Sequence, residues 1–214
     1  MRSKFDEQLA LLNRDLTKMG SLCEEALALA AKALANADGE TAAKIAPIDS
    51  EIDQMERTIE SLCLKLLLQQ QPVARDLRQI SAALKMITDM ERIGDQASDI
   101  AEIIGFLNGR IGTDAQYICQ MAVAAMRMVT ESVEAYVKRD VAMAEATIQH
   151  DDVVDDLFLK VKNSLIQMIS ENPKDGEYAL DLLMIAKYFE RIGDHATNIA
   201  EWVVFSVTGV HEQG

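Results

Sequence analysis

Apolar residues recur at alternating three- and four-residue steps along most of this chain, which is the spacing of an amphipathic α-helix. The pattern predicts six helical segments, at about residues 4–37, 40–70, 75–107, 113–138, 140–170 and from 177 onward. Gly, Pro, Asn and Asp gather at residues 38–39, 108–113 and 172–176, where turns are expected. Pro47 lies inside the second segment, so a kink or a late helix start is expected there, because proline cannot donate the helical hydrogen bond.

Each long segment carries one apolar stripe that is expected to face a core. In the third segment the stripe consists of Met86, Met90, Ile93, Ala97, Ile100 and Ile104. In the sixth it consists of Leu182, Ile185, Phe189, Ile192, Ala196, Ile199 and Val203.

Three helices, a turn and three further helices suggest an internal duplication, and the sequence contains one. Residues 91–102 read ERIGDQASDIAE and residues 190–201 read ERIGDHATNIAE, so nine of twelve positions are identical at a fixed offset of 99. Residues 49–55 are echoed more faintly by residues 151–157. We therefore expect two halves, residues 1–110 and 111–214.

The repeated segments place polar and mostly acidic side chains in columns along their helices. At about 100° per residue, the column on the third segment lies nearly opposite the apolar stripe, and its carboxylates are expected to face outward. The columns consist of Asp49, Asp53, Glu56 and Glu60 on the second segment, Glu91, Asp95, Asp99 and Glu102 on the third, Asp151 and Asp155 on the fifth, and Glu190, Asp194, Asn198 and Glu201 on the sixth.

Like charges four residues apart destabilise an isolated helix by a few tenths of a kcal/mol, and a bound cation would reverse that effect. Carboxylates on adjacent turns, facing a second pair on a neighbouring helix, supply the oxygen ligands that hard metals prefer. The spacing therefore predicts one surface metal site in each half. A solvated acidic helix face is the alternative. Gly94 and Gly193 occupy the same place in both repeats, and close contact between helices is the favoured interpretation.

Composition and charge narrow the class of protein further. Of 214 residues, 49% are apolar, 5% are aromatic, and only 10 are Gly and 3 are Pro, which favours long packed helices over β-sandwiches or barrels. The formal net charge is −14, and both halves are acidic. Binding to nucleic acid is not expected, because it needs dense cationic patches. Cations or a basic partner protein fit the charge better.

The sequence contains no pattern typical of an enzyme active site, and no catalytic residue is predicted. Glycine-rich phosphate loops, nucleophile elbows and Glu-x-x-His pairs are absent. An alternative function is histidine phosphotransfer, in which His150, followed by two aspartates, would accept a phosphoryl group.

Cys23, Cys63 and Cys119 form an odd set without a Cys-x-x-Cys motif, as in reduced cytoplasmic proteins. A signal peptide and membrane insertion are not expected.

The duplicated pentapeptide ERIGD at residues 91–95 and 190–194 resembles the PhoU family of phosphate-transport accessory regulators. Residues 49–56 (DSEIDQME) and 71–78 (QPVARDLR) support the resemblance, which extends over essentially the whole chain. It implies an all-α fold of two tandem three-helix bundles related by pseudo-twofold symmetry. It also implies a cytoplasmic homodimer that negatively regulates the phosphate-starvation response by connecting the ATPase subunit of a phosphate ABC transporter with a sensor histidine kinase.

Some members of the PhoU family carry iron or other metals on acid-x-x-x-acid motifs. Carried across, those motifs fall on Asp49 and Asp53 with Glu91 and Asp95, and on Asp151 and Asp155 with Glu190 and Asp194. The metal, whether iron, zinc, magnesium or manganese, stays open. The second half departs from the first, because Phe158 stands at the counterpart of Glu56 and Asn198 at that of Asp99. We therefore expect weaker binding there. A helical bundle that stores metal is a further alternative function.

Overall fold

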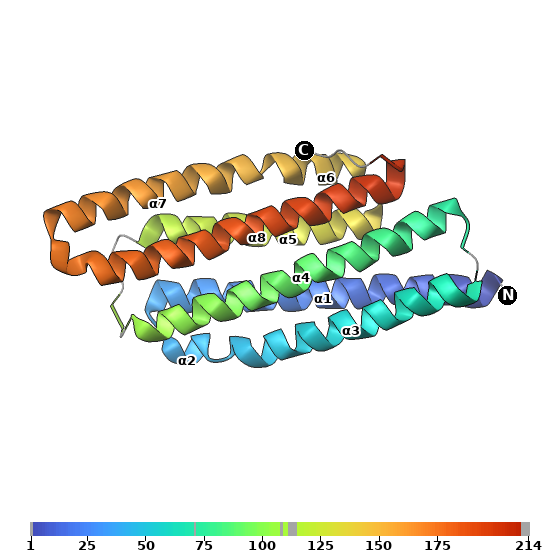
Figure 1. The fold of residues 1–214 in the computed structure, drawn as a ribbon, viewed down its shortest axis with the longest axis horizontal. Helices are drawn as coiled ribbons and strands as arrows, with labels where there is room; N and C mark the ends of the chain where they lie inside the picture. Colours follow the sequence, from blue (N-terminus) through green and yellow to red (C-terminus); the bar gives the residue numbers. More distant parts are fainter. Residues whose placement is uncertain (1, 71, 108, 111–114, 211–214) are drawn as a thin grey trace.

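Helices account for every regular element that the computed structural model describes, which covers residues 2–70, 72–107, 109–110 and 115–210. The all-α fold class is thus confirmed. The six predicted segments correspond to α1, α2 with α3, α4, α5, α6 with α7, and α8. In chain order (Figure 1), the elements are α1 (Arg2–Asn36), α2 (Gly39–Ala42), α3 (Ile45–Gln70), α4 (Ala74–Phe106), α5 (Gln116–Lys138), α6 (Val141–Gln149), α7 (Asp151–Glu171), the 3₁₀ turn η2 (Pro173–Asp175) and α8 (Gly176–Thr208).

The second predicted segment, residues 40–70, is divided into a short and a long helix, and the long helix starts late, as Pro47 suggested. A single turn, α2, is capped by the Asp38 carboxylate, which accepts the backbone N–H groups of Glu40 and Thr41. The long helix α3 then starts at Ile45, so that Pro47 lies in its first turn. Backbone N–H groups in a first turn have no helical acceptor, and proline is tolerated there.

The fifth predicted segment differs from expectation, because it is interrupted at His150 between α6 and α7. The backbone N–H of Val153 donates to the carbonyl of His150, three residues back, at 3.1 Å. This local tightening is of the 3₁₀ type, and His150 keeps right-handed helical angles (φ −69°, ψ −14°). The two helices therefore continue one another with a small change of pitch.

The apolar stripes face the core as predicted. Every stripe residue of α4 and α8 is buried, and α3 and α7 bury most of theirs, with Ile48, Leu62 and Met168 partly covered. Because aliphatic side chains and methionines fill this core, the helices can pack closely along their whole lengths.

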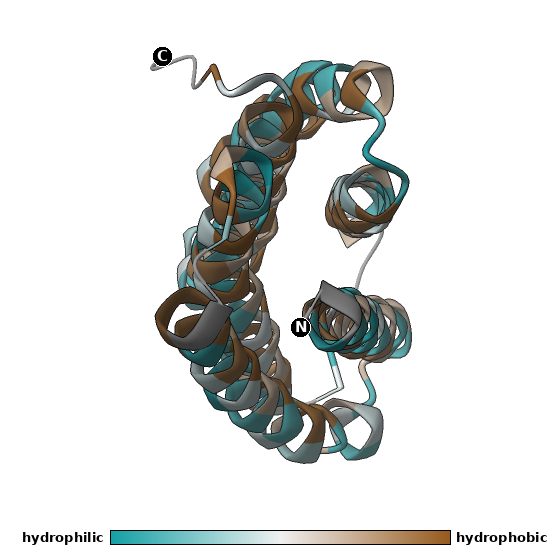
Figure 2. Cartoon of the chain, turned by 90° about the vertical axis from the view of Figure 1, so that its right-hand side faces the viewer, coloured by the Kyte–Doolittle hydropathy of each residue, from teal (hydrophilic) through white to brown (hydrophobic). Residues whose placement is uncertain are grey.

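Seen end-on (Figure 2), α3, α4, α8 and α7 form a curved row, and α1 and α5 pack against its inner face. The first bundle consists of α1, α3 and α4, and the second consists of α5, α6–α7 and α8. The bundles join where α4 lies along α8 and α1 along α5 (Figure 1). Since α4 and α8 carry the duplicated motif, the junction brings the two repeats side by side.

The contacts between α4 and α8 obey a pseudo-twofold relation. Asn198 Nδ2 donates to Asp89 Oδ1 at 3.1 Å, and Tyr188 faces Asp99. The repeat offset of 99 converts Asp89 into Tyr188 and Asp99 into Asn198, so each contact is the image of the other. The two antiparallel helices therefore cross at the level of Gly94 and Gly193.

Candidate functional site

Five carboxylates gather between α3 and α4, and we call them the first acidic cluster: Asp49, Asp53, Glu56, Glu91 and Asp95. One oxygen each from Asp49, Asp53 and Asp95 lies within 4.8 Å of the other two. Helix α3 supplies its acids on adjacent turns because they are spaced four and three residues apart, and α4 presents Glu91 and Asp95 in the same way. The structure therefore brings together the acids that the sequence predicted for the first site.

Partial burial and mutual repulsion destabilise the charged forms of these acids. Burial raises the pKa of Asp49, a hydrogen bond of 2.8 Å from Ser98 Oγ opposes the rise, and the charge of Asp95 adds to it. Burial followed by neighbouring carboxylates also raises the pKa values of Glu56, Glu91 and Asp95. The sequence predicted carboxylates on the outer surface. Asp95 is exposed, but Asp49 and Glu91 are half-buried, because α3 and α4 approach closely.

The close approach depends on glycine in both halves. A Cβ atom on Gly94 would lie 2.7 Å from Asp49 Oδ1 and 3.0 Å from Ile52 Cδ1. On Gly193 it would lie 3.0 Å from Asp151 Oδ1. The favoured interpretation of close helix contact is thus confirmed, and each glycine also accommodates the first carboxylate of a cluster.

The second acidic cluster consists of Asp151 and Asp155 on α7 with Glu190 and Asp194 on α8. Burial raises the pKa of Asp151 to about 6, with the charges of Asp194, Asp155 and Glu190 adding to the effect. Burial likewise raises the pKa values of Asp155 and Asp194. The structure therefore brings together the four acids predicted for this half.

The remaining two predicted residues, Asp99 and Asn198, lie at the contact between α4 and α8. Asp99 is near enough to Asp49 and Asp95 to raise their pKa values, so it borders the first cluster. Asn198 instead donates to Asp89 of the other half. It is engaged away from the second cluster, because the same helix face that carries the column also meets α4.

A polar bridge across this junction was not predicted from the sequence. His195 Nδ1 lies 2.8 Å from Asp89 Oδ1, and both side chains are largely covered (17% and 15% exposed). The antiparallel docking of α4 on α8 creates this bridge. The signal in the sequence was that His195 stands where the first repeat has Gln96, one of three differences over twelve positions.

The first cluster offers a donor set that fits a hard cation, whereas among the described residues no three acids of the second cluster bring their oxygens equally close together. Asp49 Oδ1 and Asp151 Oδ1 are buried atoms without a hydrogen-bond partner among the described residues, and each lies in the space left by a glycine. An unpaired buried oxygen is costly, and carboxylates are the ligands that Mg²⁺, Mn²⁺ and Ca²⁺ prefer. A cation would satisfy these oxygens and remove the repulsion between the acids.

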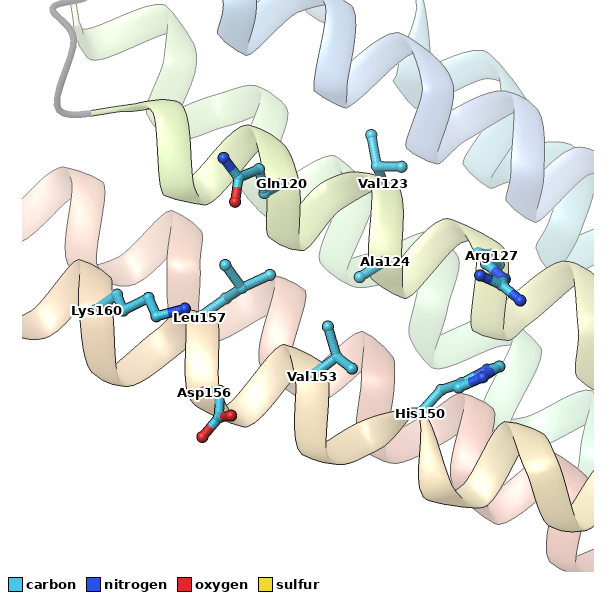
Figure 3. A pocket seen from close by; sticks show the side chains of 9 residues that line it. All are labelled: Gln120, Val123, Ala124, Arg127, His150, Val153, Asp156, Leu157 and Lys160. Atoms are coloured by element: carbon cyan, nitrogen blue, oxygen red, sulfur yellow. The ribbon is translucent and has the colours of Figure 1, made fainter.

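A groove of about 500 Å³ runs between α5 and α7, and Figure 3 shows the side chains that line it. Val123, Val153 and Leu157 make it largely apolar in its middle. His150 lies at one end, where its Nδ1 is 2.9 Å from Glu131 Oε2. This contact ties the ring to α5.

None of the helices in the described part of the chain combines the length and apolar character that crossing a lipid bilayer requires.

Comparison with known proteins gives a consistent result. The PhoU domain model matches residues 16–104 and again residues 118–203. A Clostridium acetobutylicum protein called phosphate-specific transport system accessory protein PhoU homolog is 37% identical, over 97% of this chain and 96% of that protein. A Synechocystis protein of the same name is 36% identical, over 99% of this chain and 94% of its own.

Solved structures agree with the sequence comparisons. The crystal structure of PhoU from Pseudomonas aeruginosa superposes with a TM-score of 0.92 at 34% identity, covering 96% of this chain and all (100%) of that one. The phosphate transport system regulatory protein PhoU from Streptococcus pneumoniae gives 0.88 at 26% identity, covering 98% and 99%. With two domain matches that follow its duplicated acidic helices, the chain belongs to the PhoU family.

Proposed function

We propose that this chain is an accessory protein of phosphate-specific ABC transport and a negative regulator of the phosphate-starvation response. It acts in the cytoplasm as a homodimeric adaptor between the ATPase subunit of the transporter and a sensor histidine kinase. The similarity to curated transport accessory proteins over nearly the whole chain carries the proposal. A body of long packed helices suits an adaptor.

Cation binding is the second part of the proposal. The two acidic clusters hold cations through Asp49, Asp53, Glu56, Glu91 and Asp95 in one half, with Asp99 at its border, and through Asp151, Asp155, Glu190 and Asp194 in the other. The clustered carboxylates with raised pKa values and the unpartnered oxygens support it. A bound cation would neutralise surface charge and so prepare these faces for contact with a partner.

Deletion of the gene tests the regulatory role. In high phosphate, the deletion strain is expected to express the phosphate-starvation genes constitutively, and the gene restored in trans is expected to repress them. Unaltered repression in the deletion strain would contradict the proposal. Co-purification of the tagged protein with the transporter ATPase and the kinase tests the adaptor role separately.

Elemental analysis of purified protein tests the cation sites. The double variant Asp95→Ala/Asp194→Ala removes one ligand from each cluster and is expected to lose bound metal. Asp156→Ala is a matched control, because Asp156 is an exposed acid on α7 that lines the groove instead of the cluster. Equal metal content in wild type and double variant would exclude these residues as ligands.

A further inference from the structure

The two acidic clusters differ in how closely they hold a cation that the protein itself supplies. In the second cluster, Lys187 Nζ donates to Glu190 Oε1 at 2.6 Å and also to Glu190 Oε2. The same ammonium group lies 5.5 Å from the centre of the Phe158 ring. Lys187 is thus held between a carboxylate and an aromatic face, both of which attract a positive charge.

The first cluster has neither of these two groups. Thr88 stands at the position that matches Lys187, and Glu56 stands at the position that matches Phe158. One half therefore has a neutral and an acidic residue where the other has a basic and an aromatic one. These two differences act in the same direction, because both make the second cluster less negative.

The cations near the first cluster are held more loosely. Arg57 Nη2 lies 3.9 Å from Asp53 Oδ2, and Arg92 Nε lies 3.7 Å from Glu91 Oε2. Both distances exceed a hydrogen bond, and both guanidinium groups are mostly exposed (70% and 55% of their side chains). Exposed pairs of this kind are weak. Arg57 still opposes the raised pKa of Glu56, and Arg92 opposes those of Glu91 and Asp95, so the two halves differ in how closely the cation is held.

Lys187 acts on more than one acid of its cluster. Burial raises the pKa values of Asp155 and Asp194, and the charge of Lys187 opposes the rise at both. Glu190, which Lys187 contacts directly, is well covered, with 15% of its side chain exposed. The ammonium group therefore already engages both carboxylate oxygens with which Glu190 would bind a metal.

We infer that Lys187 is a built-in counter-ion that sets the cation affinity of the second acidic cluster. The first cluster is the tight divalent-cation site of the chain, and the second is a weaker site in which a metal must displace Lys187 from Glu190. This inference rests on the proposed cation binding. It assigns the difference between the halves to the residue pair Lys187 and Phe158, which replaces Thr88 and Glu56.

Titration of chelator-treated protein with Mn²⁺, followed by the electron paramagnetic resonance signal of free Mn²⁺, tests the inference. Wild type is expected to show one tight site per chain and a second site at least about tenfold weaker. Lys187→Thr, which installs the residue of the first half, is expected to strengthen the second site about tenfold. The reciprocal change, Thr88→Lys, is expected to weaken the first site. Asp95→Asn removes a carboxylate of the first cluster and is therefore expected to weaken the tight site.

A second variant guards against a loss of fold. Lys187→Met keeps an unbranched stem against Phe158 and removes the charge, so it is expected to behave as Lys187→Thr does, with unchanged circular dichroism. Two equal sites in wild type, or unchanged binding in both Lys187 variants, would overturn the inference while leaving the proposed cation binding intact. No Mn²⁺ binding by wild type or variants would overturn both.

Discussion

Asp49 Oδ1 lies so close to Gly94 that a Cβ atom built on this glycine would be 2.7 Å from the oxygen. The contact joins α3 to α4 at the point where the first acidic cluster forms. Asp151 and Gly193 repeat it at 3.0 Å in the second half. A glycine inside a helix costs about 1 kcal/mol relative to alanine. Its recurrence therefore marks a place where room for the carboxylate outweighs helix propensity.

Gly94→Ala is expected to destabilise the protein by about 1–2 kcal/mol, because the new methyl group must displace both Asp49 and Ile52. Displacement of Asp49 is also expected to weaken Mn²⁺ binding at the first cluster by about tenfold or more. Gly193→Ala is expected to have a smaller effect on stability, since its closest atom is farther away. Urea unfolding and Mn²⁺ titration of both variants check these expectations.

Gly105 provides the control for helix propensity on α4. Nothing lies within 4 Å of a Cβ built there, and the residue is exposed. Gly105→Ala is expected to stabilise the protein by up to about 1 kcal/mol and to leave Mn²⁺ binding unchanged. Equal stabilisation by Gly94→Ala would show that the Asp49 contact does not restrict position 94.

The stability of the metal-free protein is expected to depend on pH through Asp151. Its folded pKa is about 6, above the ordinary aspartate value of 3.8. The native state therefore binds the proton more tightly than the unfolded state does. Stability from this group is fully present below about pH 4 and is lost as the pH rises through 6. Unfolding by urea in a chelator is expected to be easier at pH 7 than at pH 5.

Asp151→Asn removes the buried charge and is expected to stabilise the metal-free protein at pH 7 by about 1 kcal/mol, with the gain shrinking towards pH 5. Asp152→Asn is the matched control, because the carboxylate of Asp152, next in the chain, is exposed. Little change in stability is expected for this variant at either pH. If Asp151→Asn stabilises the protein equally at pH 5 and pH 7, the titration of Asp151 is not the source of the gain.

Thiol labelling is expected to distinguish the three cysteines. Burial raises the pKa of Cys63 to about 12 and also raises that of Cys23, and both are fully buried. Burial raises the pKa of Cys119 on α5 as well, but its side chain is only partly buried and so is accessible to the reagent. Since the thiolate is the reactive form, iodoacetamide at pH 8 should modify native protein at Cys119 alone. Labelling of Cys119→Ser before urea is added would contradict this expectation.

Local periodicity was sufficient to predict most of the fold. The stripe from Met86 to Ile104 is buried as expected, because an amphipathic helix has one way to cover its apolar face. The i, i+4 spacing placed acids on adjacent turns, and the resemblance to the PhoU family paired Asp49 and Asp53 with Asp95, which the structure brings together.

The parts that were not predicted depend on how distant helices meet. The contact of His195 with Asp89 spans 106 residues and exists only because α8 docks antiparallel on α4. Lys187 was overlooked because its importance depends on the orientation of its side chain towards Glu190 and Phe158. Spacing along one helix does not determine either feature.

The bridge between His195 and Asp89 is expected to stabilise the junction of the two bundles. A double-mutant cycle with Asp89→Asn and His195→Gln should give a coupling energy of about 1 kcal/mol in urea unfolding, because both partners are largely covered. Glutamine is the residue that the first repeat carries at the matching position, Gln96.

The pair Lys18 and Glu51 is the control for this cycle. It also joins two helices, with Nζ 2.7 Å from Oε1, but its side chains are about half exposed (57% and 49%). Their coupling is expected to be below about 0.5 kcal/mol. Equal coupling in the two cycles would show that burial at the junction adds nothing to this contact.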